Sequence, residues 1–107
     1  MHDLYTHLTY IMALASDTPY EILTSTSRLS SVVTARQIVW HYLKHSREWT
    51  SVDIARKAKK DHTTVLYGVG RIKTDLSLDW EPTVRLYSRF LRLLAEEAQA
   101  KAYNATH

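Results

Sequence analysis

The chain lacks cysteine and contains very little glycine or proline. Without cysteine, its 107 residues form neither disulfides nor thiolate metal sites, and a cytoplasmic location is favoured. Two glycines and two prolines leave few turn signals, and no alternating β-branched segment lies between hairpin turns. The chain also lacks an apolar run of about 18 residues, so we expect a soluble protein without a membrane partner.

The remaining pattern is helical, and the length suits a single domain over residues 1–107. Apolar residues at helical spacing predict an all-α fold of about six helices, with a helix-turn-helix core and a long C-terminal helix. The first helix is expected over residues 3–16, and the last has Pro82 in its first turn. The predicted N-terminal caps are two capping boxes and two single residues, namely Thr18 with Glu21, Thr34 with Gln37, Thr50, and Asp61.

Positive charge is concentrated in the middle of the chain. Residues 28–73 carry ten basic and three acidic side chains, whereas both flanking segments are net acidic. A basic centre between acidic ends is typical of a nucleic-acid footprint. A solvated surface explains the charge about equally well, so the charge pattern alone leaves both interpretations open.

Two segments within this basic region match a helix-turn-helix. Ile54, Ala55 and Ala58 form the buried side of the first helix, and Val65 follows Ala55 by ten residues. In such a motif a small alanine lies where the helices cross, and a β-branched residue locks the second helix onto the first. Val65 and Leu66 are therefore expected to hold the second helix in place. Its exposed first turn would then enter the major groove of DNA.

The residues of that first turn have the chemistry to read base edges. Asp61 can accept a hydrogen bond from a cytosine amino group, and His62 can donate one to a purine acceptor. Thr63 can contact a thymine methyl group. Phosphate contacts suit the three lysines beside this turn, which are Lys57, Lys59 and Lys60.

The run from residue 28 to residue 72, RLSSVVTARQIVWHYLKHSREWTSVDIARKAKKDHTTVLYGVGRI, resembles the DNA-binding C-terminal domain of the bacterial replication initiator DnaA. The motif has an arginine-glutamine pair (Arg36–Gln37), a polar residue before the helix-turn-helix, and DHTTVL at residues 61–66. The resemblance implies a fold like that of the Trp repressor and of the initiator's DNA-binding domain, with double-stranded DNA as the partner.

The resemblance also implies roles for single residues. Arg28 matches a basic-loop arginine that enters the minor groove. The residues that match major-groove base readers are Asp61, His62 and Thr63. The positions that match DNA-backbone contacts are Lys44, Ser51, Thr64 and Tyr67, although serine and tyrosine are not the usual residues there.

The chain departs from the family pattern in three respects. Its KAKKDHTT turn is one residue shorter than the usual form, and Lys59–Lys60 stand where the family has glycine. Ser51–Val52 replaces a leucine-proline pair. The family's ATPase domain is missing, and because glycine occurs only at positions 68 and 70, no phosphate loop for a nucleotide can be formed.

Catalysis and metal binding have little support in the sequence. No nucleophile, base and acid occur together, so we expect no enzyme and no cofactor. His41 and His45 lie four residues apart but lack a nearby acid or cysteine, so we expect no metal site. Trp40, Trp49 and Trp80 are expected to pack in or near the core.

The last helix carries two apolar stripes. The predicted buried stripe consists of Val84, Tyr87, Leu91, Leu94 and Ala98. The second stripe, which consists of Leu86, Phe90 and Leu93, would dock on the first helix or would support a homodimer or a protein partner. The sequence thus predicts sequence-specific binding of double-stranded DNA at DnaA-box-like sites, in regulation of replication or transcription. The alternative is an adaptor that binds protein through this helix.

Overall fold

The computed structural model describes residues 3–106, which form six α-helices and no strand. The helices are α1 (Leu4–Ala15), α2 (Tyr20–Leu23), α3 (Ser30–Ser46), α4 (Ser51–Ala58), α5 (His62–Ser77) and α6 (Glu81–Thr106). The predicted all-α class and the long C-terminal helix are confirmed. No helix within these residues combines the length and the apolar composition needed to cross a membrane.

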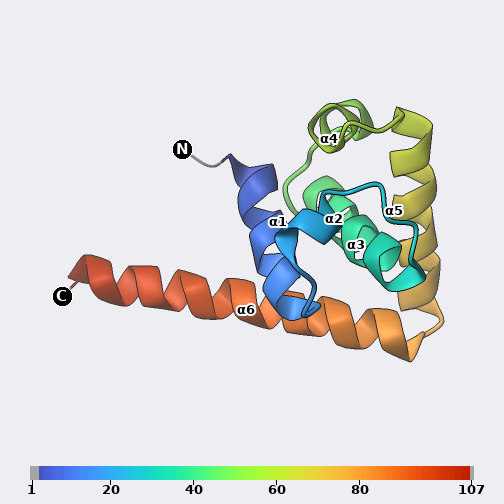
Figure 1. Ribbon diagram of the computed structural model, residues 1–107. Coiled ribbons are helices and arrows are strands. Elements are labelled where there is room, and N and C mark those ends of the chain that lie inside the picture. The colour runs from blue at the N-terminus through green and yellow to red at the C-terminus, as the bar shows by residue number, and fades with distance from the viewer. Residues whose placement is uncertain (1–2, 107) are drawn as a thin grey trace.

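Helix α3 lies at the centre of the fold, and the other five helices surround it (Figure 1). Helix α5 packs along one side of α3 and α1 along the other, while α4 contacts both α3 and α5. Helix α6 runs beneath this group, and its C-terminal half projects beyond α1 (Figure 1). The molecule is therefore elongated, with extents of 45 × 31 × 26 Å.

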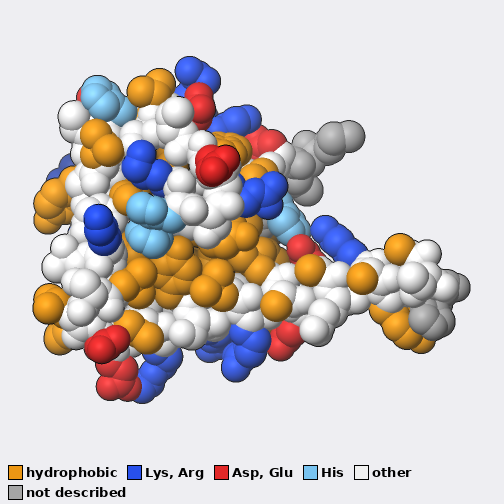
Figure 2. Space-filling model, turned by 180° about the vertical axis from the view of Figure 1, so that it is seen from behind, with side chains coloured by type: hydrophobic (Ala, Val, Ile, Leu, Met, Phe, Trp, Pro, Cys, Tyr) orange, Lys and Arg blue, Asp and Glu red, His pale blue; other side chains and the backbone are white. Residues whose placement is uncertain are grey.

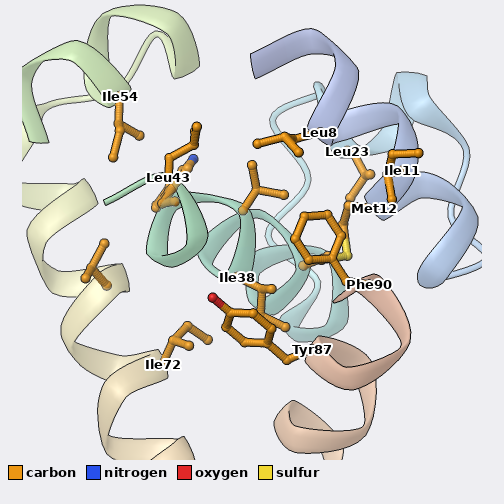
Figure 3. Close-up of a cluster of buried hydrophobic side chains, with 14 of the residues drawn as sticks. Leu8, Ile11, Met12, Leu23, Ile38, Leu43, Ile54, Ile72, Tyr87 and Phe90 are labelled. Carbon is orange, nitrogen blue, oxygen red and sulfur yellow. The ribbon is translucent and has the colours of Figure 1, made fainter. Parts of the chain in front are cut away.

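The core forms where the apolar faces of these helices meet around α3 (Figure 3). Ile38 and Leu43 of α3 are fully buried, and Phe90 of α6 inserts between α3 and α1. Removal of such side chains from water is the main driving force of folding. The large apolar side chains that are fully buried are Phe90, Leu8, Met12, Ile38, Leu43, Ile54, Ile72 and Val65.

Three helices end in the same hydrogen-bonding arrangement, although the chain has no glycine at their ends. The N–H groups of Thr18, Lys60 and Trp80 each donate to a carbonyl oxygen five residues earlier, at 3.1, 3.0 and 2.8 Å. In such Schellman motifs the preceding residue adopts a left-handed conformation, which is usually reserved for glycine. Here the left-handed residues are Asp17 (φ 50°), Lys59 (φ 56°) and Asp79 (φ 51°).

Both predicted capping boxes are wrong. Helix α2 begins after Pro19 without a side-chain cap, and the Thr18 hydroxyl instead donates to the carbonyl of Ser16 at 3.1 Å. Helix α3 begins at Ser30, four residues before the predicted cap at Thr34. The buried side chain of Val32 belongs to the apolar face of α3, so packing extends the helix past the local capping signal.

The two single caps are confirmed. The Thr50 hydroxyl oxygen accepts from the backbone N–H of Asp53 at 3.1 Å, and α4 begins directly after it. The Asp61 carboxylate accepts from the backbone N–H of Thr63 at 2.8 Å, and α5 begins at His62. Each cap satisfies a backbone donor that the helix leaves unpaired.

The predicted buried stripe of α6 is confirmed only in part, because Tyr87 is buried but the buried face is shifted toward the neighbouring stripe. Thr83, Tyr87 and Phe90 are buried, whereas Leu91 is 44% exposed. The second stripe docks against α1 and the core, and His7 Nε2 lies 2.7 Å from Glu97 Oε1 between the two helices. The prediction for Trp80 is also wrong, since this side chain is 57% exposed.

Candidate nucleic-acid interface

Helices α4 and α5 form the predicted helix-turn-helix. Ile54 and Val65 are fully inaccessible to solvent, and Ala55 is buried between the two helices. The carbonyl oxygen of Ala55 accepts hydrogen bonds from the N–H groups of both Lys59 and Lys60. The burial expected for Ile54, Ala55 and Val65 is therefore confirmed, while Ala58 is only partly buried. Ala55 supports the turn as well as the packing.

Lys59 determines how the short turn is made. Its backbone is left-handed (φ 56°, ψ 46°), so a lysine stands in a glycine-like conformation. This conformation costs a non-glycine residue about 1 kcal/mol. The turn nevertheless places Asp61 as the N-cap of α5. We call residues 59–64 the recognition turn.

Within the recognition turn, Asp61 binds both the backbone and the side chain of Thr63. Its Oδ1 atom accepts from Thr63 N at 2.8 Å and from Thr63 Oγ1 at 2.6 Å. These hydrogen bonds, first that of the hydroxyl and then that of the amide, lower the pKa of Asp61 below its ordinary value. His62 Nδ1 lies 3.7 Å from the same oxygen. Asp61 therefore stays ionised at neutral pH and fixes the position of Thr63.

All polar side chains of the first turn of α5 are exposed, as are those just beyond it. Asp61, His62, Thr63 and Thr64 face solvent, and Tyr67 is 73% exposed. Leu66 is 47% exposed, so the expectation that it holds the helix in place is wrong. Of the two residues only Val65 has that role, because consecutive residues of a helix point in different directions. Sequence reasoning missed Leu66 as an apolar surface residue next to the predicted base-reading residues.

The loop between α2 and α3, residues 24–29, carries Arg28 in an exposed position. We call it the basic loop; it passes in front of α3 in Figure 1. The Arg36 side chain on α3 binds this segment through its backbone carbonyls. Its Nε donates to Leu23 O at 2.7 Å, its Nη1 to Ser27 O at 2.6 Å, and its Nη2 to Ser25 O at 2.7 Å. Burial lowers the pKa of Arg36 from its ordinary value, but an arginine keeps its charge throughout the physiological range.

The neighbouring residue, Gln37, connects α3 to α5. Its side chain is buried, and its Oε1 accepts from Arg71 Nη1 at 2.7 Å. A Cβ atom added at Gly68 would lie 2.8 Å from Gln37 Cγ and 2.9 Å from Trp40 Cε3. The absence of a side chain at Gly68 therefore lets the two helices approach closely. Sequence reasoning identified the Arg36–Gln37 pair but not what either side chain binds.

The lysines near the turn differ in their surroundings. Lys57 Nζ lies 2.6 Å from Asp3 Oδ2 on the N-cap of α1, and this contact is the main reason why the pKa of Asp3 is lowered to about 2. No acid among residues 3–106 pairs with Lys59 or Lys60, and both are exposed. Lys44 is half-buried on α3. Lys59 and Lys60 are thus free to contact phosphate, whereas Lys57 is held by Asp3.

Ser51 does not fit its predicted role. It is buried at the start of α4, and its hydroxyl oxygen is enclosed without a hydrogen-bond partner. An enclosed hydroxyl cannot reach a DNA phosphate, so the structure argues against Ser51 as a side-chain contact to the DNA backbone.

A cleft of about 510 Å³ is lined mostly by α1, α2 and α3, and both the basic loop and the recognition turn contribute to its wall. Thr24, Ser25 and Thr26 line it from the loop, and Lys59 and Lys60 line it from the turn. Hydroxyl and ammonium groups thus face a common space, which is a suitable environment for phosphate oxygens.

The histidine pair on α3 forms no metal cluster. His41 and His45 have ring centroids 4.3 Å apart, and His41 Nδ1 lies 2.8 Å from the Tyr87 hydroxyl. Burial, followed by the charges of His45 and Lys73, lowers the pKa of His41 to about 4. Across residues 3–106, no group of three or more histidine or carboxylate side chains is placed to hold a metal ion.

Comparison with known families agrees with this geometry. The family model described as "Bacterial dnaA protein helix-turn-helix" matches residues 10–72. The match includes α2, α3, α4 and most of α5, and therefore both the basic loop and the recognition turn. No curated protein matches the chain significantly. Since the match covers more than half of the chain, the chain belongs to the bacterial DnaA helix-turn-helix family of DNA-binding domains.

Proposed function

We propose that this protein binds double-stranded DNA sequence-specifically through two elements at once. The recognition turn would enter the major groove, and Arg28 of the basic loop would enter the neighbouring minor groove. The observation that carries the proposal is the exposed first turn of α5, whose polar side chains are anchored by the Asp61 cap and the buried Val65.

Base reading is assigned to Asp61, His62, Thr63 and Arg28. Because Asp61 Oδ1 is bound by Thr63, its other carboxylate oxygen is the one left to accept from a cytosine amino group. His62 would donate to a purine acceptor. The exposed Leu66 adds an apolar side chain that suits a thymine methyl group.

Phosphate contacts are assigned to Lys44, Lys59, Lys60, Thr64 and Tyr67. Lys59 and Lys60 are supported best, because they are exposed, have no acidic partner among residues 3–106, and line the cleft to which both elements contribute. Lys57 would join them only by leaving Asp3, to which it is bound at 2.6 Å. Such contacts position the protein on DNA without reading its sequence.

The target would be a short asymmetric box related to that of the initiator, and the role would be regulation of replication or transcription. Support comes from the unbroken DHTTVL run at residues 61–66, within a chain that belongs to this family. One basic loop and one recognition turn together suit an asymmetric site that a single copy can read.

The test is selection of duplexes from a random library at low salt. We expect a defined sequence to be enriched, with affinity that falls steeply as salt rises. His62→Ala should relax preference at one base pair, and Arg28→Ala should lower affinity about tenfold. Lys101→Gln on α6 is a charge-matched control that should bind normally. If the wild-type protein retards no duplex from the library, the proposal is wrong.

A second candidate is protein binding through the face opposite to the basic loop. Figure 2 shows a broad area of hydrophobic side chains there, next to the projecting α6. A contact of this kind depends on apolar area, so it should persist at high salt, where DNA binding fails. Sedimentation of the protein alone in high salt would detect self-association, and a monomer there would argue against a homodimer.

A further inference from the structure

The basic loop is bound by one side chain that comes from outside its own segment, Arg36 of α3. The Arg36 guanidinium donates to the carbonyl oxygens of four residues, of which two lie at the end of α2 and two in the loop. The distances range from 2.6 Å at Ser27 to 3.3 Å at Ile22. Ser27 directly precedes Arg28, so the shortest of these hydrogen bonds fixes the backbone next to the minor-groove residue.

Among the basic side chains, only arginine can donate hydrogen bonds to several separate carbonyl oxygens in this geometry. Its planar guanidinium offers five N–H donors in a fixed fork, whereas a lysine ammonium is a compact charge with three donors. Three nitrogen atoms of Arg36 are used in four hydrogen bonds. They are therefore occupied by the protein itself, and the side chain is half-buried rather than displayed to DNA.

The other hydrogen bonds of the loop are local. The Thr24 and Ser25 hydroxyls donate to carbonyl oxygens of α2, with Ser25 Oγ 2.6 Å from Ile22 O. Residues 24–27 carry only threonine and serine side chains, and none of residues 24–29 is buried. Local contacts from Ser25 Oγ to Ser27 N (3.1 Å) and from Ser27 Oγ to Leu29 N (3.4 Å) are exposed or partly exposed and span two residues. A loop that is ordered only on binding loses affinity, because its conformational entropy must be given up at that moment.

The same turn of α3 also positions α5, the helix that follows the recognition turn. Gln37 accepts from Arg71 on α5 at 2.7 Å and lies against Gly68. Arg36 and Gln37 are adjacent on α3, and they bind the basic loop and α5, respectively. Helix α3 therefore helps to set the separation between Arg28 and the recognition turn.

We infer that Arg36 is a positioning residue for minor-groove reading, which orders the basic loop so that Arg28 meets the minor groove while the recognition turn occupies the major groove. This inference rests on the proposed function. Arg36 itself makes no base contact, so its entire effect on DNA affinity passes through Arg28.

The experiment uses a duplex that changes only the minor groove. Replacing adenine by 2,6-diaminopurine adds an amino group there and keeps the major-groove edge of the A·T pair. On the selected duplex, wild-type protein should lose about tenfold in affinity after this replacement, and Arg28→Ala should lose almost nothing. Arg36→Lys, which keeps the charge, should behave like Arg28→Ala. His62→Ala should keep the full wild-type sensitivity.

A second readout is the DNA affinity of the double variant that combines Arg36→Lys with Arg28→Ala. Arg36→Lys should lower affinity about fivefold to tenfold in the wild-type background and almost not at all in the Arg28→Ala background. Equal losses in both backgrounds, or an Arg36→Lys variant that keeps wild-type sensitivity to diaminopurine, would overturn the inference. A wild-type protein that binds the duplex but ignores diaminopurine overturns it as well. Failure to bind any duplex instead refutes the proposed function.

A second variant, with changes in the loop only, keeps the inference testable if Arg36→Lys does not fold. Ser25→Gly with Ser27→Gly removes the local hydroxyl contacts and leaves Arg36 in place. This variant should also lose part of its sensitivity to diaminopurine, because a looser loop presents Arg28 less well. Undiminished sensitivity would show that the order of the loop does not govern minor-groove reading.

Discussion

In the recognition turn the stabilising contacts come from residues of the turn and its own helices, whereas the basic loop is held by a side chain of α3. Asp61 binds Thr63, two residues away, and Ala55 binds Lys59 and Lys60 across the turn. Arg36 reaches carbonyls that lie nine to fourteen residues earlier in the chain. A local cap survives changes elsewhere, but a loop held from a distance depends on the position of α3.

The largest effect is expected from Gly68→Ala, which forces α3 and α5 apart and so disturbs the helix that holds the basic loop. Gly68→Ala places a Cβ 2.8 Å from Gln37 Cγ and 2.9 Å from Trp40 Cε3, and Trp40 is buried. Overpacking of this kind outweighs the gain in helix propensity, so we expect a loss of about 1–2 kcal/mol in the free energy of unfolding. Denaturant unfolding measures it.

Gly70→Ala is the matched control for that variant, because no atom from another part of the fold lies within 4 Å of the added Cβ. It should raise the free energy of unfolding by up to about 1 kcal/mol through helix propensity alone. Equal changes in the two variants would contradict the close approach of α3 and α5 at Gly68.

The recognition turn alone is altered by Lys59→Gly. Removal of the side chain from a left-handed residue should stabilise the protein by up to about 1 kcal/mol, and the basic loop should not change. Lys60→Gly removes the same charge at a residue without a positive φ, so it should not stabilise. Denaturant unfolding of both variants separates strain from charge, and a destabilised Lys59→Gly would argue against strain at this position.

Asp3→Asn tests whether Lys57, which lines the cleft beside the basic loop and the recognition turn, can contact DNA. The amide keeps an oxygen for the N-cap of α1 but releases the charge partner of Lys57, which lies 2.6 Å away. A free Lys57 gains access to phosphate, so we expect a few-fold gain in DNA affinity and a salt dependence steeper by about one charge. Titrations at several salt concentrations measure both. Unchanged binding would place Lys57 outside the interface.

The smallest effect is expected from lowering the pH, which should alter the Asp61 cap in the recognition turn and leave the basic loop unchanged. Hydrogen bonds from Thr63 hold the pKa of Asp61 below 3.8, so the cap is complete above that value and is lost as pH falls through the lowered pKa. Arg36 does not titrate there. In NMR titrations the Thr63 amide should shift below pH 3.8 while the Ser27 amide remains in place. Parallel shifts would mean that the two regions are coupled.

Much of the fold and part of the site could be predicted from the residues. The presence of six helices, the buried Ile54, Ala55 and Val65, and the caps at Thr50 and Asp61 follow from local patterns and are confirmed, whereas α3 begins four residues before its predicted cap. The face that α6 buries could not be predicted, because its two apolar stripes are adjacent and only docking on α1 decides between them. The enclosure of the Ser51 hydroxyl and the exposure of Leu66 likewise depend on how the helices pack.

Sequence patterns suffice for the recognition turn because its contacts span only a few residues, and the chemistry of Asp61, His62 and Thr63 can be read directly from the chain. The tertiary structure alone decides that Arg36 binds the basic loop, that Gln37 binds Arg71, and that Asp3 engages Lys57. These contacts join residues nine to fifty-four positions apart, so their distances depend on helix packing and on no local pattern.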